Sequence, residues 1–180
     1  MKTQKVLLIG GPGTGKSSVM AKLEQIGFVC FHEISREVTL QARKEGIDQL
    51  FLEQPLLFSK KLLAGRINQH KEAENAAEKI VFLDRGIPDI SAYLDFTNTP
   101  YPTTFIEANK NYSYDIVFIF PLWEEIYTKD QERYESLAEA KLIQQQLITT
   151  YKNLGYILVE VPKASVEKRV EFILNFLNMN

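Results

Sequence analysis

Cysteine and histidine are scarce in this sequence, which has one cysteine and two histidines among 180 residues. A single cysteine has no partner for an internal disulfide, and one Cys with two His cannot supply the ligands of a Cys/His zinc site. Because Cys30 lies in the apolar run 28–31 (FVCF), we expect it to be an inert core thiol. We expect His32 to lie inside a strand and His70 at the boundary of a buried helical face, so neither is a candidate ligand.

Long hydrophobic runs and an excess of one charge are also missing. The apolar residues 6–9 (VLLI) are too few for the hydrophobic region of a signal peptide, and the run 116–123 (IVFIFPLW) is far shorter than the ~20 residues of a membrane span. The 21 basic and 23 acidic residues leave a net charge of -2, which argues against nucleic acid as the main ligand. We therefore expect a cytoplasmic protein that binds neither nucleic acid nor a membrane.

What the sequence does contain is a regular alternation of short apolar segments and helical segments. Strands are expected over 5–9, 28–32, 80–83, 115–120 and 156–161. Helices are expected over 17–26, 34–44, 48–77, 134–154 and from 165 onward, with a short helix ending at 94 and a loop over 95–104. This alternation predicts βαβ units, and hence one α/β domain over 1–180 with three layers and a central five-stranded parallel sheet. Ligands of such sheets bind beyond the carboxyl ends of the strands.

A glycine-rich motif follows the first expected strand. Residues 10–17 (GGPGTGKS) fit the pattern G-x-x-x-x-G-K-[ST] of a P-loop NTPase, also called Walker A, at every fixed position. Its glycines let backbone N–H groups turn inward around a β-phosphate, and the next helix adds the positive end of its dipole. Lys16 is expected to reach the β- and γ-phosphates of ATP, and Ser17 to ligate Mg²⁺. The expected nucleotide-binding residues are Gly11, Pro12, Gly13, Thr14, Gly15, Lys16, Ser17 and Ser18.

Charged residues follow the second and third expected strands. Glu33 stands at the start of a helix, with Arg36 on the same face. Glu33 either stabilises that helix start, or orients or deprotonates a substrate hydroxyl, or acts through the water shell of the metal. Asp84 follows the apolar run 80–83, as does the acid that holds Mg²⁺ in P-loop proteins. Arg85 either binds substrate or pairs with an acid, and both interpretations stay open.

The segment between the fourth expected strand and the long helix carries the run DQER at 130–133. In an α/β kinase this region forms a mobile lid that brings a cation to the transferring phosphoryl group. We expect a lid around 121–134 with Arg133 as that cation, the alternative being a solvated arginine at a helix start. The expected catalytic residues are therefore Lys16, Glu33, Asp84, Arg85 and Arg133, and the expected metal ligands are Ser17 and Asp84.

With these segments assembled, the chain resembles the NadR-type AAA-domain family of P-loop ATPases, relatives of ribosylnicotinamide kinase. The resemblance is carried by residues 10–17, by HEISRE at 32–37, by FLDRGIPD at 82–89, by DQER at 130–133 and by residues 154–170. It implies a kinase-like fold, ATP as the nucleotide, and an adenine beside residues 162–164. Asp84-Arg85 is more similar to nucleotide and nucleoside kinases than to ribosylnicotinamide kinases.

Three functions compete at this point. The first is an Mg²⁺-dependent kinase, a transferase that moves the γ-phosphoryl of ATP to a small nucleoside- or nucleotide-like acceptor held by 48–77 and 95–104. The second is a regulatory ATPase whose nucleotide state controls a protein partner. A GTP-dependent switch is disfavoured because 109–112 (NKNY) lacks the aspartate of N-K-x-D and 84–87 lacks the D-x-x-G spacing. Remodelling ATPases usually place a second acid where this chain has Arg85, which favours phosphoryl transfer. A homodimer or a protein partner stays open.

Overall fold

The computed structural model describes residues 2–11, 13–126 and 136–179, and its centre is one parallel sheet of five strands. The strand order is β2-β3-β1-β4-β5, and each neighbouring pair runs parallel. The strands are β1 (Gln4–Ile9), β2 (Val29–Phe31), β3 (Ile80–Asp84), β4 (Ile116–Ile119) and β5 (Leu158–Glu160). The predicted α/β fold with a five-stranded parallel sheet is confirmed.

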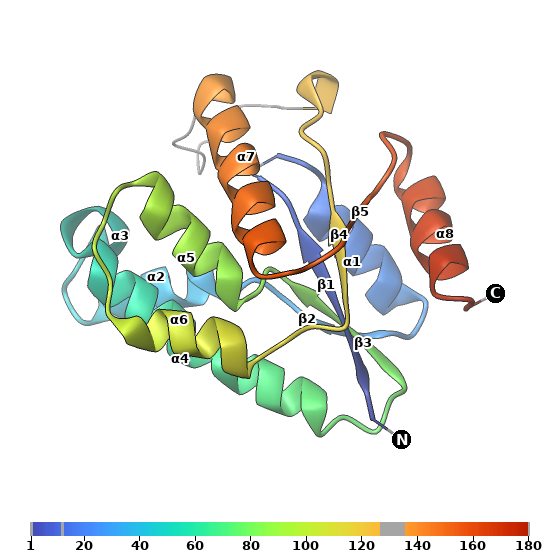
Figure 1. Ribbon diagram of the computed structural model, residues 1–180, viewed down its shortest axis with the longest axis horizontal. Helices are drawn as coiled ribbons and strands as arrows, with labels where there is room; N and C mark the ends of the chain where they lie inside the picture. The colour runs from blue at the N-terminus through green and yellow to red at the C-terminus, as the bar shows by residue number, and fades with distance from the viewer. Residues whose placement is uncertain (1, 12, 127–135, 180) are drawn as a thin grey trace.

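Helices cover both faces of the sheet (Figure 1). On one face, Val6 and Leu8 of β1 pack with α1 (Lys16–Gln25) and α8 (Val166–Phe176). On the other face, Leu7 and Ile9 pack with α4 (Pro55–Glu74), α5 (Ile87–Phe96) and α7 (Leu137–Asn153). Because side chains alternate between the two faces of a strand and both are covered, β1 is apolar throughout its second half.

A third apolar cluster joins helices beside the sheet. It packs α2 (Ser35–Lys44), α4, α5 and α6 (Thr103–Asn111) through Leu63, Ile90 and Phe105, which are buried. The short helices α3 (Leu50–Glu53) and η1 (Glu124–Ile126) complete the described elements. This lobe lies on the β2 and β3 side of the sheet, away from β5 (Figure 1). No helix in the described ranges is long and apolar enough to cross a membrane.

The single helix expected over 48–77 is wrong, because the chain forms two helices there. Pro55 begins α4, and proline disfavours the helical conformation in the residue before it. Gln54 accordingly has φ -140° and ψ 67°, which separates α3 from α4. Gln49, not Asp48, precedes the first of the two helices.

Two further boundaries differ from the expectation. The loop expected over 95–104 is shorter, since α5 continues to Phe96 and the unpredicted helix α6 begins at Thr103. Pro102 had indicated a loop, but with φ -65° it stands directly before α6, where proline is tolerated. Strand β2 ends at Phe31, so His32 is exposed beside Glu24 instead of lying inside the strand.

Helix α7 supplies a direct test of the apolar interface between helices and sheet. Leu147 is 2% exposed and Leu142, on the opposite side of the same helix, is 60% exposed. Leu147→Ala should lower the free energy of unfolding by about 2–5 kcal/mol, because it leaves a cavity against β1 and α5. Leu142→Ala is the control and should stay within about 0.5 kcal/mol of wild type in urea unfolding. Equal destabilisation by both variants would contradict the packing described here.

Candidate active site

The phosphate loop connects β1 to α1 through backbone that favours glycine. Gly13 and Gly15 have φ of 74° and 80°, a region that side chains with a Cβ seldom adopt. The buried Lys16 ammonium donates to the carbonyl oxygens of Gly10 (2.9 Å) and Gly11 (3.2 Å). Burial and the nearby Arg85 lower the pKa of Lys16 to about 8. At neutral pH the loop therefore still holds a cation.

Two side chains from distant helices hold this loop. The Gly11 N–H donates to Gln144 Oε1 of α7 (2.6 Å), and Gln144 Nε2 donates to the Phe120 carbonyl (3.0 Å). From α8, Arg169 Nη1 donates to the Thr14 carbonyl (3.0 Å). Sequence reasoning missed both contacts. The only sign of these contacts in the sequence is that a glutamine and an arginine stand beside the apolar positions of two amphipathic helices.

Arg169 also accounts for the glycine at position 15, and it contacts the ring of Trp123. A Cβ added at Gly15 would lie 2.7 Å from Arg169 Nη1, so the guanidinium approaches the loop only because this position has no side chain. The Arg169 guanidinium carbon lies 5.6 Å from the centre of the Trp123 ring, a cation–π distance. This contact ties the start of α8 to the segment after β4.

Next to the phosphate loop, one carboxylate is held between two arginines. Arg85 Nε lies 2.6 Å from Glu33 Oε2, and Arg66 Nη2 donates to both Glu33 oxygens at 3.1 and 3.2 Å. Arg66 is a buried residue of α4, and its Nη1 donates to the Gly86 carbonyl (2.6 Å). It was not found from the sequence because it belongs to no motif and lies in the middle of a helix.

Asp89 anchors the other end of this cluster. Its Oδ2 accepts from the Gly86 N–H (2.8 Å) and from the Tyr151 hydroxyl (2.5 Å), and its Oδ1 lies 3.6 Å from Arg85 Nη1. Arg85 has φ 68°, a left-handed conformation that costs of order 1 kcal/mol for a residue with a side chain. Its N–H donates to the Leu8 carbonyl (3.0 Å). The two carboxylates and this bond hold Arg85 in that conformation.

The charge state of Glu33 follows from its neighbours. Burial raises the pKa of Glu33, but Arg66, Arg85 and the Ser35 N–H outweigh burial and lower the pKa to about 2. Glu33 is therefore ionised at neutral pH. It is a strong hydrogen-bond acceptor and a weak base, which favours orientation of a hydroxyl over removal of its proton.

The residues expected to bind Mg²⁺ lie on two adjacent elements. Asp84 ends β3 beside Leu8 of β1, and it is buried. Burial raises the pKa of Asp84, and its Oδ1 has no hydrogen-bond partner among the described residues. Ser17 is exposed in the first turn of α1. A buried carboxylate oxygen without a partner, beside a phosphate loop, fits a cation that takes few protein ligands.

Four of the five expected catalytic residues thus lie together at the carboxyl ends of β1, β2 and β3, where their charges act on one another. They are Lys16, Glu33, Asp84 and Arg85. Of the loop residues, Thr14 is buried with its hydroxyl donating to the Gly11 carbonyl (3.0 Å), and Ser18 is exposed on α1. Pro12, Arg133 and residues 127–134 of the expected lid lie outside the described residues.

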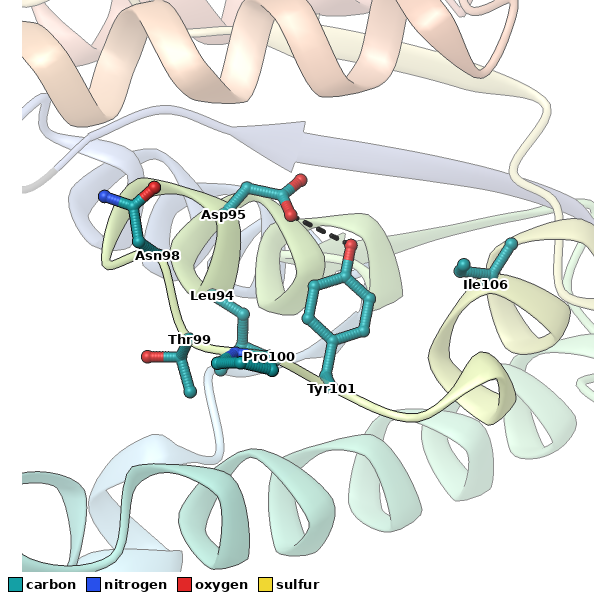
Figure 2. A pocket seen from close by; sticks show the side chains of 7 residues that line it. All are labelled: Leu94, Asp95, Asn98, Thr99, Pro100, Tyr101 and Ile106. Carbon is teal, nitrogen blue, oxygen red and sulfur yellow. Dashed lines mark hydrogen bonds between the residues drawn. The ribbon is translucent and has the colours of Figure 1, made fainter.

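A separate hollow of about 380 Å³ lies between the end of α5 and the start of α6 (Figure 2). It is lined by Leu94, Asp95, Asn98, Thr99, Pro100, Tyr101 and Ile106. The Tyr101 hydroxyl donates to Asp95 Oδ1 (3.0 Å), as Figure 2 shows. None of the lining residues belongs to the cluster around Glu33, which lies at the other end of α5. The hollow is thus separate from the candidate active site, although it includes part of the loop expected to hold an acceptor.

A phosphate loop after the central strand, an acid at the end of the neighbouring strand and helices on both faces of a parallel sheet define a P-loop nucleotide-binding protein of the kinase-like type. Residues 5–169 match a family of AAA domains, and the chain belongs to this family. The predicted AAA-domain membership and kinase-like fold are confirmed. No curated protein matches the sequence.

Solved structures with a similar fold include two kinases and a NadR protein. A deoxyadenosine kinase from M. mycoides, with the products dCMP and dCDP bound, is 19% identical with a TM-score of 0.74 and coverage of 98% of this chain and 100% of that one. A thymidylate kinase from Candida albicans is 15% identical with a TM-score of 0.73, covering 99% and 92%. A NadR protein in complex with NR is 18% identical with a TM-score of 0.73, covering 98% of this chain and 50% of that one. At these identities the likeness is one of fold.

The pKa of Glu33 predicts a specific dependence of stability on pH. Since this pKa is about 2 in the folded chain and 4.5 ordinarily, Glu33 stabilises the fold above pH 4.5, and this contribution is lost as the pH falls toward about 2. Glu33→Gln lacks this contribution at every pH. As the pH is lowered from 4.5 toward about 2, its free energy of unfolding should therefore fall less than that of wild type. Glu37→Gln, an exposed acid of α2, is the control and should keep the wild-type loss. Identical pH profiles of wild type and Glu33→Gln would refute the assignment.

Proposed function

We propose that this protein is an Mg²⁺-dependent phosphotransferase that moves the γ-phosphoryl of ATP to a small nucleoside- or nucleotide-like acceptor. The observation that carries the proposal is the Glu33 carboxylate, paired with Arg66 and Arg85 next to the phosphate-loop Lys16. Remodelling ATPases usually place a second acid, which acts on water, directly after the acid that binds the metal, the position that Asp84 has in this proposal. Here that neighbour is Arg85, which pairs with acids and carries the charge that a phosphoryl acceptor site needs.

Each residue then has a role in the transfer. An acceptor hydroxyl oxygen forms a bond to the γ-phosphorus, and the bond from that phosphorus to the β–γ bridging oxygen breaks to release ADP. The hydroxyl proton passes to an oxygen of the transferred phosphoryl group and from there to solvent. Glu33 accepts a hydrogen bond from the hydroxyl and orients it. Lys16, Arg85 and Arg133 supply positive charge to the transferring phosphoryl group. Ser17 and Asp84 would hold Mg²⁺, which neutralises charge on the β- and γ-phosphates when bound.

The chemical class of the phosphoryl acceptor is inferred from the fold and the site together. The similar structures are a deoxyadenosine kinase, a thymidylate kinase and a NadR protein in complex with NR. Their acceptors or ligands, by name, are nucleosides or nucleotides. The paired arginines beside Glu33 suit such a molecule, because they can bind the hydroxyls or the phosphate of its sugar. A nucleoside or a nucleoside monophosphate is therefore the first acceptor to test.

Nucleotide binding through the phosphate loop is tested with Lys16→Ala. Loss of the ammonium should weaken binding of Mg²⁺–ATP by more than about tenfold and leave adenosine binding unchanged, because the lost contact is to phosphate. Lys22→Ala, a partly exposed lysine on the same helix α1, is the control and should bind like wild type. Isothermal calorimetry measures all three proteins. Equal affinity of wild type and Lys16→Ala for ATP would exclude this role of the loop.

Phosphoryl transfer is tested with Glu33→Gln, which keeps one oxygen for Arg66 and the Ser35 N–H. Its ATP affinity should stay near that of wild type, while transfer to the acceptor should slow by about 10²-fold or more. The assay follows the label of γ-³²P-ATP into a panel of nucleosides and nucleoside monophosphates, with Glu37→Gln as the control. Hydrolysis at full rate without any acceptor, responsive only to a protein partner, would replace the kinase by the regulatory ATPase.

A further inference from the structure

Helix α7 passes close to both loops of the candidate active site. The first is the phosphate loop after β1, and the second is the loop after β3 that carries Arg85 and Gly86. In Figure 1, α7 lies over the sheet next to α5. Two buried polar side chains of α7, Gln144 and Tyr151, reach these loops. They lie about two helical turns apart, and hence on one face of the helix.

The contact with the phosphate loop is tight and polar. Gln144 accepts the Gly11 N–H at 2.6 Å and donates to the Phe120 carbonyl at 3.0 Å, so the bond pattern specifies the orientation of its amide. A Cβ at Gly11 would lie 3.3 Å from Gln144 Oε1 and 3.4 Å from the Ala140 carbonyl oxygen. The loop backbone therefore rests directly on α7, and a shift of the Gly11 N–H must move Gln144 or break the bond.

The contact with the second loop is equally close. Tyr151 is fully buried, and its hydroxyl donates to Asp89 Oδ2 at 2.5 Å. A Cβ at Gly86 would lie 2.8 Å from the same hydroxyl, so this loop too approaches α7 through a glycine. Asp89 faces Arg85, which pairs with Glu33. The Tyr151 hydroxyl is thus linked through Asp89 to the two residues proposed to face the acceptor.

We propose that α7 couples the phosphate loop to the acceptor loop, with Gln144 and Tyr151 as positioning residues. The physical argument is the stiffness of the helix. Leu147, which lies between the two side chains, is buried against the sheet, so α7 moves as one body and not by local repacking. A nucleotide that shifts the Gly11 N–H then also shifts Tyr151 against Asp89. The inference rests on the proposed function, since that function assigns the first loop to the phosphate donor ATP and the second to the phosphoryl acceptor.

Coupling of this kind acts in both directions. If nucleotide binding alters the geometry of Asp89 and Arg85 through α7, then a change at Tyr151 must in turn alter nucleotide affinity. Tyr151→Phe removes only the hydroxyl and keeps the ring in the core. It should weaken binding of Mg²⁺ with a non-hydrolysable ATP analogue by about threefold or more, although Tyr151 does not touch the phosphate loop.

A double-mutant cycle distinguishes coupling from a general loss of stability. In Gln144→Met, which has a similar shape but no amide, the additional change Tyr151→Phe should no longer alter the affinity by more than about twofold. Thr149→Val is the control, because it removes a hydroxyl of the same helix that is exposed and donates within α7, to the Gln145 carbonyl at 3.0 Å. It should bind the analogue like wild type. Additive effects of the two α7 changes, or an unchanged affinity in Tyr151→Phe, would overturn the coupling.

Hydrogen exchange gives a second measurement that needs no nucleotide and no variant of Gln144. In the free protein, Tyr151→Phe should speed exchange of the amides over residues 10–16 relative to wild type, and Thr149→Val should not. Unchanged exchange in Tyr151→Phe would refute the coupling. If wild type fails to bind the analogue while exchange changes as expected, the proposed function fails and the link through α7 stands.

Discussion

The Glu33 carboxylate, held between the guanidinium groups of Arg66 and Arg85, is the interaction on which the candidate site depends. It joins the end of β2, the middle of α4 and the end of β3, three segments that are distant in sequence. A buried arginine needs a partner, because an unpaired charge inside the protein is costly. Arg66 has two, Glu33 and the Gly86 carbonyl, so this pairing also specifies the course of the loop that carries Arg85.

The glycines of the site let side chains from later helices approach the loops closely, and this is as important as the backbone conformations that glycine allows. Gly11 meets Gln144, Gly15 meets Arg169, and Gly86 meets Tyr151, and in each case a Cβ would crowd a polar atom of a helix that comes later in the chain. Gly86 has extended backbone that any residue adopts, so space alone requires glycine there. The loops of the site are therefore shaped by α7 and α8 as well as by the strands that precede them.

Burial acts in opposite directions on the two charged groups next to the phosphate loop. It lowers the pKa of Lys16 and raises the pKa of Asp84, so each charged form is less favourable than in water. In the proposed function, the triphosphate supplies negative charge to Lys16 and the metal supplies positive charge to Asp84. The groups that burial destabilises are then the ones that the ligands stabilise, which links nucleotide binding to the stability of the site.

The sequence by itself determined the class of fold and the phosphate loop, because apolar strands, helix periodicity and the spacing of residues 10–17 are local patterns. It also placed Lys16, Glu33, Asp84 and Arg85 at strand ends, and a parallel sheet brings those ends to one edge. It did not reveal Arg66, Asp89, Gln144, Tyr151 or Arg169 as parts of the site, nor the break before Pro55. Only the tertiary structure decided these partners, since each contact joins segments far apart in the chain and depends on packing that no local pattern encodes.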